Sequence, residues 1–177
     1  MAILRQIAQL GQPVLRREAG AVDDPRAPQV QAIIDDMLAT AADANGAGLA
    51  APQVFESLAL FVVTSAPSQR YPDAPDREPM VVINPEIVRY SDEMENGWEG
   101  CLSIPGLRGL VPRHRRITVR YLDRQGGLCE EELDGFVARV FQHEFDHLRG
   151  VVFIDRVAGS HDLVTEKEYF RALQGRP

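Results

Sequence analysis

The pattern of apolar and polar positions predicts a chain of mixed helices and strands. A helix is expected from Pro28 to about Asn45, because apolar residues recur at helical spacing and a proline suits the first turn. Residues 58–64 form a short apolar run, which is typical of a buried strand. The first 27 residues contain several glycine and proline turn signals. We therefore expect an irregular lead-in, then a helix, then the first strand.

The middle of the chain is predicted to be rich in strands. Residues 116–122 alternate apolar and polar side chains before a glycine-containing turn, as the first strand of a hairpin does. Pro85 cannot donate to a strand ladder, so it is expected to separate two strands. Residues 66–79, which contain four prolines, are expected to form a surface loop. The predicted strands of this region are Met80–Asn84, Glu86–Tyr90, Arg116–Leu122 and Leu128–Leu133.

A helix that carries chemistry is predicted close to the C-terminal end. From Phe136 to Leu148 apolar residues surround the helix instead of forming one stripe, as in a buried central helix, and Asp134 is the expected N-cap. His143 and His147 lie one turn apart on the same face, so both imidazoles can reach one metal ion. Glu144 can contact a water on that metal without being a ligand, which is the place of a general base. Buried histidines and carboxylates need partners, and a metal ion supplies them. Residues 165–173 are expected to form at most a short helix.

Composition and charge narrow the classes of function. The 177 residues, 45% hydrophobic and 25% charged, are ordinary for one globular unit, so residues 1–177 are expected to form a single domain. The net charge of −7 argues against a broad electrostatic contact with nucleic acid or an anionic membrane. The apolar runs are too short to span a bilayer, and Arg5 interrupts the region where a signal peptide needs apolar residues. We expect a cytoplasmic protein that acts on small or peptide ligands.

The two cysteines are too few for a disulfide framework, and they are interpreted differently. Cys129 lies in a predicted strand, where it is expected to be a small packed residue. Cys101 lies beside a glycine and before a Pro105-Gly106 turn, and a thiolate there would bind a divalent transition metal well.

The residue pattern alone leaves the third metal ligand open. A catalytic metal site usually has three protein ligands and keeps one position for water. Phe153 occupies the position of the third histidine in the extended metzincin pattern, which closes that route. A downstream carboxylate, Glu166 or Glu168, could serve as in other zinc peptidases, although both lie in the weak C-terminal helix. Cys101 is the other strong candidate.

Three stretches together resemble the peptide deformylase family. GAGLAAPQ at 46–53, by itself a loop of small residues that suits a helix cap, is similar to the GxGLAAPQ motif. EGCLS at 99–103 and QHEFDH at 142–147 are similar to the other two family motifs, EGCLS and QHExDH, in the same order and spacing. The resemblance runs from the N-terminal segment to about residue 155. It implies an α+β fold with small, mainly antiparallel sheets packed around the central buried helix that carries HExxH.

The resemblance also implies roles for individual residues. The implied metal ligands are Cys101, His143 and His147. Glu144 would be the general acid and base, taking a proton from the metal-activated water and then protonating the departing amine. The Gln53 side chain and the Leu102 backbone N–H would share the charge of the oxyanion. Glu99 would brace the site from behind the ligands.

The implied reaction removes the N-terminal formyl group from formyl-methionyl nascent peptides and releases formate. Gly46 and Gly48 would let the peptide lie extended against the protein backbone. Arg108 matches a family position near the peptide backbone, and it is equally open to interpretation as a surface arginine. Four further residues depart from the common family pattern or resemble its organellar-like subgroup, and they leave the depth of the methionine pocket open: Ala47, Trp98, Phe136 and Arg139.

The implied cofactor is one divalent metal ion, with Fe²⁺ expected from the resemblance. The affinity order of divalent metals favours Zn²⁺ over Fe²⁺ at such a site, and Zn²⁺, Ni²⁺ or Co²⁺ could occupy it in a purified sample. The short C-terminal helix differs from the long basic ribosome-docking helix of some bacterial members, so only transient ribosome contact is expected. We expect a monomer with no membrane partner and no sequence-specific nucleic-acid partner.

Two other classes of function remain as alternatives. An HExxH zinc endopeptidase would share Glu144 but take its third ligand from downstream. A non-catalytic peptide-binding or redox module would need none of the chemistry of Glu144.

Overall fold

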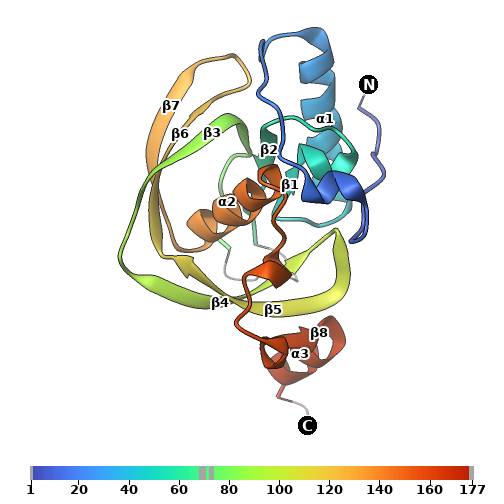
Figure 1. The fold of residues 1–177 in the computed structure, drawn as a ribbon, viewed down its shortest axis with the longest axis vertical. Coiled ribbons are helices and arrows are strands. Elements are labelled where there is room, and N and C mark those ends of the chain that lie inside the picture. The colour runs from blue at the N-terminus through green and yellow to red at the C-terminus, as the bar shows by residue number, and fades with distance from the viewer. Residues whose placement is uncertain (1, 68–70, 72–73, 176–177) are drawn as a thin grey trace.

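Two antiparallel sheets surround one buried helix in the computed structural model, which describes residues 2–67, 71 and 74–175 (Figure 1). The helices of this part of the chain are α1 (Pro28–Asp43), α2 (Gly135–Leu148) and α3 (Glu166–Leu173). The strands are β1 (Gly48–Ala50), β2 (Leu60–Val63), β3 (Met80–Tyr90), β4 (Met94–Cys101), β5 (Ile104–His114), β6 (Arg116–Leu122), β7 (Leu128–Asp134) and β8 (Leu163–Thr165). Short 3-10 turns lie at Pro13–Arg16, Ala51–Val54, Phe153–Asp155 and Ser160–Asp162. The α+β prediction is confirmed.

Each sheet has an edge strand beside the predicted chemistry. The five-stranded sheet has the order β1-β2-β3-β6-β7, and the three-stranded sheet has the order β4-β5-β8. The residues of EGCLS belong to β4 and to the tight turn before β5, where Cys101 pairs with Ile104. The residues of GAGLAAPQ were expected to form a loop, but Gly48–Ala50 form β1 and pair with β2. Both motifs therefore lie at sheet edges, where their backbone is open to a further strand.

The central helix α2 is buried as its apolar pattern predicts. It crosses the hollow of the curved five-stranded sheet (Figure 1). Phe141 packs edge to face on Phe61 of β2, with the two ring centres 4.9 Å apart. Burial extends to polar residues such as Gln142 and His147. Asp134 is the N-cap residue, but its carboxylate pairs with Arg115 instead of capping the helix. The helix is thus held chiefly by packing on its whole circumference.

The predicted break at Pro85 is a bulge within one strand. The strand β3 runs continuously, and its register with β6 shifts between Ile83 and Glu86. Asn84 adopts a positive φ of 50° there, and its side chain bonds both the N–H and the carbonyl of Val22. The side chain of Asn84 thus ties the irregular N-terminal segment to the bulge.

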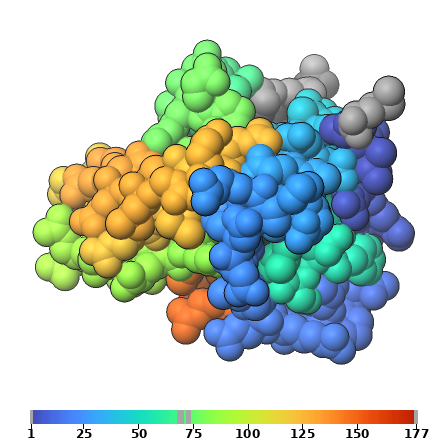
Figure 2. Space-filling model, turned by 90° about the horizontal axis from the view of Figure 1, so that it is seen from above, coloured from blue at the N-terminus to red at the C-terminus, as the bar shows by residue number. Residues whose placement is uncertain are grey.

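The helix α1 packs on the face of β1 and β2 opposite α2, against Leu49, Leu60 and Val62. The tip of the β6–β7 hairpin meets α1 (Figure 2), where Arg124 donates hydrogen bonds to Gln31 and Asp35 at 2.8 and 2.9 Å. The helices predicted near residues 28–45 and 165–173 are confirmed as α1 and α3. The loop predicted over residues 66–79 lies partly outside the described residues. None of the described helices is both long and apolar enough to cross a membrane.

Candidate active site

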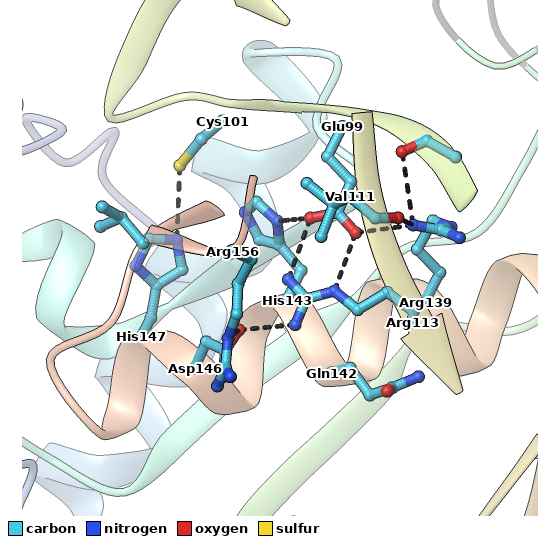
Figure 3. Close-up of polar contacts among 12 residues, drawn as sticks. Glu99, Cys101, Val111, Arg113, Arg139, Gln142, His143, Asp146, His147 and Arg156 are labelled. Carbon is cyan, nitrogen blue, oxygen red and sulfur yellow. Dashed lines mark hydrogen bonds and ion pairs between the residues drawn. The ribbon is translucent and has the colours of Figure 1, made fainter. Parts of the chain in front are cut away.

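One thiol and two imidazoles meet where the end of β4 lies over α2 (Figure 3). The ligand atoms offered by Cys101, His143 and His147 all lie within 4.8 Å of one another, and the three residues are buried. Within the cluster, Cys101 Sγ lies 3.3 Å from His147 Nε2. The i,i+4 spacing of the histidines on α2 and the sharp turn after Cys101 together create this cluster.

The donor set fits a divalent transition metal. A thiolate and two imidazoles are ligands that such metals bind, and three protein ligands are the number at a catalytic zinc-type site. Burial and the nearby His143 hold the pKa of His147 well below its usual value, so its imidazole is in the neutral form that a ligand needs. In the described part of the chain, the alternatives Glu166 and Glu168 bond Arg108 and Arg171 and do not belong to this cluster.

Glu99 orients the first histidine. His143 Nδ1 lies 2.9 Å from Glu99 Oε2, which leaves Nε2 as the ring atom available to a metal (Figure 3). Burial by itself would raise the pKa of Glu99, but the hydrogen bond with His143 and the paired Arg113 hold that pKa well below its usual value. Glu99 is therefore a carboxylate at neutral pH, as a brace for a ligating histidine should be.

Buried charges extend this network behind the histidines. Arg113 donates two hydrogen bonds to Glu99, at 2.9 and 3.0 Å, and a third to Asp146 at 2.6 Å. Arg156 bonds the same Asp146 from the protein surface, at 2.6 Å. Burial would lower the pKa of Arg113, but the two carboxylates raise it. The result is a continuous chain of paired charges from His143 to the surface.

Glu144 lies beside the cluster with one oxygen unused. It is buried, and its Oε2 has no hydrogen-bond partner among the described residues. Burial raises the pKa of Glu144 to about 7, which is suitable for a group that takes and returns a proton near neutral pH. A Cβ placed on Gly48 would lie only 2.5 Å from Glu144 Oε1. The glycine of β1 therefore makes room for the carboxyl group of Glu144.

The amide of Gln53 is held in one orientation. Its Oε1 accepts a hydrogen bond from Ala50 N–H at 2.8 Å, and its Nε2 lies 3.1 Å from Ser103 Oγ and 3.5 Å from Cys101 Sγ. The N–H donors of Gln53 consequently point toward the thiol. Leu102 lies next to Cys101 in the turn between β4 and β5, outside the paired strand positions.

A cavity of about 270 Å³ opens beside these groups, between the edge strands β1 and β4. Its wall is mixed apolar and polar, as in most ligand-binding cavities. Arg139 lies in this wall against Gly97, where an added Cβ would be only 2.7 Å from the guanidinium carbon. The lining residues that the sequence predicted are Gly46, Ala47, Gly48, Gln53, Trp98, Glu99, Cys101, Leu102, Phe136, Arg139, His143 and Glu144.

Two residues that the sequence analysis discussed, Arg108 and Cys129, lie outside the cavity wall. Arg108 is fully buried, so it is not a surface arginine, and it lies behind Gly100 instead of lining the cavity. Cys129 is half-buried in β7, where its Sγ lies 3.8 Å from the carbonyl of Gly127, consistent with the packing role predicted for it.

Three residues of the site were not foreseen from the sequence. Arg113 and Asp146 form the ion pair behind the histidines, and Tyr71 lines the cavity from the loop after β2. Asp146 stands three positions after His143 on the same helix, so helical spacing could have indicated it. Arg113 lies in an arginine-rich stretch that gives no sign of burial, and Tyr71 lies in a proline-rich loop.

Comparison with known proteins gives a consistent result along most of the chain. The family model described as polypeptide deformylase matches residues 4–162. Peptide deformylase 2 of Nostoc sp. is 55% identical over 94% of this chain and 93% of the relative. Peptide deformylase 1 of Bordetella pertussis is 48% identical over 88% of each chain. A class I type b peptide deformylase from Acinetobacter baumannii, solved with Met-Ala-Ser bound, is 42% identical with a TM-score of 0.86, covering 89% of this chain and all of that one.

Proposed function

Since the chain belongs to the polypeptide deformylase family, it removes the formyl group from the N-terminus of nascent polypeptides, and we propose that this hydrolysis takes place in the cavity beside Cys101. The observation that carries the proposal is the meeting of a thiol, two imidazoles, a carboxyl group and an amide at one buried cavity. Residues 1–177 are proposed to act as one catalytic domain.

Cys101, His143 and His147 are the proposed ligands of one divalent metal ion. A bound ion supplies Lewis acidity, which lowers the pKa of a water molecule and polarises an amide carbonyl. A thiolate and two imidazoles suit Fe²⁺, which is the proposed metal in the cell, and equally accept Zn²⁺, Ni²⁺ or Co²⁺ in a purified sample. Glu99 keeps His143 turned toward the ion through the 2.9 Å contact with Nδ1.

Glu144 is the proposed carrier of the proton. Its unpartnered Oε2 can take a proton from the attacking water and then return it to the departing amine nitrogen. The pKa of about 7 places both steps within reach near neutral pH. Gly48 leaves the space that the carboxyl group of Glu144 occupies, because a larger residue would collide with Oε1.

Gln53 and Leu102 are the proposed donors to the developing oxyanion. The side chain of Gln53 is already oriented by Ala50 and Ser103, so its N–H group needs no rearrangement as charge develops. The backbone N–H of Leu102 lies in the turn next to Cys101 and supplies a second donor.

The peptide is proposed to lie extended between the two strand edges. Gly46 and Gly48 border one side of the cavity and β4 the other, which suits recognition of main chain with little dependence on sequence. The Acinetobacter relative was solved with Met-Ala-Ser, and we propose the same kind of peptide for this chain. Arg108 is proposed to act on peptide binding indirectly, since it lies behind the cavity wall.

The zinc endopeptidase alternative is not favoured. It required a downstream carboxylate ligand, whereas Glu166 bonds Arg108 and the cluster contains Cys101. The enzyme is proposed to be monomeric and cytoplasmic. Its ribosome contact is proposed to be only transient, because α3 is eight residues long and carries both acidic and basic side chains.

Formate release tests the proposed function. The anaerobically purified, iron-loaded protein is expected to release formate from formyl-Met-Ala-Ser and to leave acetyl-Met-Ala-Ser intact. Absence of formate from the metal-loaded protein would overturn the proposal, and cleavage of an internal peptide bond instead would favour an endopeptidase.

A further inference from the structure

The C-terminal end of the chain forms a second layer behind one wall of the cavity. The strand β8 pairs with β5 at Leu107, Arg108 and Gly109, and α3 follows directly. In Figure 1, α3 lies beyond β4 and β5, on the side opposite α1. None of the described residues of β8 or α3 lines the cavity itself. We call Arg108, Glu166, Tyr169 and Phe170 the backing layer.

Arg108 is the centre of the backing layer. Its side chain is 1% exposed, and NH2 donates to Glu166 Oε1 at 2.7 Å. The guanidinium carbon lies 5.2 Å from the ring centre of Tyr169 and 5.6 Å from that of Phe170, within cation–π distance. A buried guanidinium enclosed by two rings and a carboxylate has little freedom to move. It is therefore a rigid support for whatever lies in front of it.

Three residues of the cavity wall rest on this layer. Trp98 contacts Tyr169, with ring centres 5.7 Å apart. Tyr71 lies over the guanidinium of Arg108 with its ring centre 5.5 Å away. Gly100 lies so close to the same arginine that an added Cβ would be 2.9 Å from its Nε. All three of these residues also line the cavity.

We propose that the β8–α3 segment is a positioning element for substrate binding, in which Tyr169 and Arg108 hold Trp98 and Tyr71 at the cavity wall. This inference rests on the proposed function, because it assigns the wall to peptide binding. Among the described residues, those of β8 and α3 neither line the cavity nor belong to the metal-ligand cluster. Loss of the backing layer should therefore weaken peptide binding and leave the chemical step intact. Tyr169 is thus a positioning residue and not a catalytic one.

Replacement of Tyr169 tests this proposal with two independent readouts. Tyr169→Ala is expected to raise KM for formyl-Met-Ala-Ser by about three- to tenfold, the range for loss of one aromatic contact, with kcat and metal content unchanged. The chain has one tryptophan, so protein emission excited at long wavelength reports Trp98 alone. Its emission should move to longer wavelength in Tyr169→Ala, because the indole gains contact with water.

Matched variants separate positioning from general damage. Tyr169→Phe keeps the ring and should restore both KM and emission to wild-type values. Leu173→Ala changes an exposed residue of the same helix and should alter neither. Tyr169→Leu keeps apolar volume but lacks the ring. If the alanine variant does not fold, the leucine variant is measured in its place and should show the same changes in KM and emission.

The proposal has clear contrary outcomes. Wild-type KM and wild-type emission in both Tyr169→Ala and Tyr169→Leu would overturn it, as would a loss of kcat and metal with no change in KM. If the wild-type protein released no formate, the proposed function would fail. Titration of Trp98 emission with Met-Ala-Ser would then decide this inference, because weaker binding by Tyr169→Ala supports it and equal binding overturns it.

Discussion

Two parts of the cavity wall are stabilised by different kinds of contact. On the metal side, around His143, buried charges pair through short hydrogen bonds, as between Arg113 and Glu99 at 2.9 Å. On the part of the wall that we call the aromatic side, rings pack against one another, and the ring centres of Trp98 and Tyr169 lie 5.7 Å apart. The ring centres of Tyr71 and Phe136 form a second such contact at 5.2 Å. Contacts on the metal side depend on hydrogen-bond direction, whereas those on the aromatic side depend mainly on apolar area.

This difference matches what each side has to do. Breaking a buried ion pair destabilises a protein by about 3–5 kcal/mol, whereas an aromatic contact contributes about 0.5–1.5 kcal/mol. Strong directional contacts keep ligands and proton carrier in one geometry, which hydrolysis requires. Weaker contacts over large rings tolerate small shifts, which suits peptides that differ after their first residue. Substitutions on the two sides should therefore differ in size and in the kinetic constant that they change.

The largest effect is expected at the metal ligands. Cys101→Ser should empty the metal site and abolish formate release, because the thiolate is one of the three proposed ligands. Metal content by elemental analysis and formate release measure the effect. Cys129→Ser is the matched control, since Cys129 lies in β7 away from the cluster, and it should keep full metal content. Metal loss from the Cys129 variant with retention by the Cys101 variant would reverse the assignment.

The next effect is expected at the proton carrier. Glu144→Gln keeps the size of the side chain but cannot accept a proton, so turnover should fall by about 10²–10⁴-fold with metal retained. Activity of the wild type should fall with acidification below about pH 7, because a protonated Glu144 cannot act as base and its pKa is raised to about 7 by burial. A pH profile of kcat/KM checks both points.

Gln53→Leu provides the contrast for this pH profile. It removes one neutral donor to the oxyanion and should lower turnover by about 10²-fold. Glu144 still titrates in this variant, so the acidic limb should remain, whereas Glu144→Gln should alter it. Near wild-type turnover in Glu144→Gln would contradict the mechanism while leaving the metal site in place.

A loss of stability is expected behind the histidines. Arg113→Met leaves Glu99 and Asp146 buried without their shared partner, which should lower the free energy of unfolding by about 3–5 kcal/mol. Denaturant unfolding measures it. Arg120→Met breaks an exposed pair with Glu130 between β6 and β7 of the five-stranded sheet, and it should lower the free energy of unfolding by at most about 1 kcal/mol. Equal losses in the two variants would show that burial of the pair has no bearing on stability.

The smallest effect is expected on the aromatic side. Phe136→Leu removes the ring that contacts Tyr71 at the cavity wall but keeps apolar volume. KM for formyl-Met-Ala-Ser should rise by about two- to fivefold with kcat unchanged, as for loss of a modest ring contact. Steady-state kinetics measure this split. A fall in kcat with unchanged KM would contradict the division of roles between the two sides.

The elements with clear periodicity were predictable from the sequence. The helices α1 and α2 and the β6–β7 hairpin follow patterns that burial of one face or of the whole helix imposes. The β4–β5 hairpin was not predicted, because Gly97, Gly100 and Pro105 suggest turns. In the folded chain Gly97 lies under the guanidinium of Arg139 and Gly100 under that of Arg108. Their place in a strand therefore depends on contacts between elements, which the local sequence pattern does not show.

The candidate site likewise has a part that was predictable from the sequence and a part that was not. The pairing of His143 with His147 follows from helical spacing, whereas Cys101 was selected as third ligand only by the family resemblance, and the structure brings the three together. The burial of Arg113 and of Arg108 could not be predicted, because an arginine in an alternating strand usually faces water. Burial of these charges is tolerable because Arg113 pairs with Glu99 and Asp146, and Arg108 pairs with Glu166, all through tertiary contacts.

The two recessed strand edges have a consequence for timing. Unpaired edges usually invite other chains to add a strand, but β1 and β4 turn theirs toward the cavity between them. A chain end already paired within its own sheet has no free backbone groups to offer there. In the proposed binding mode only an extended, still unfolded end enters. Removal of the formyl group would then compete in time with the folding of the substrate, and fast-folding N-terminal segments would escape it.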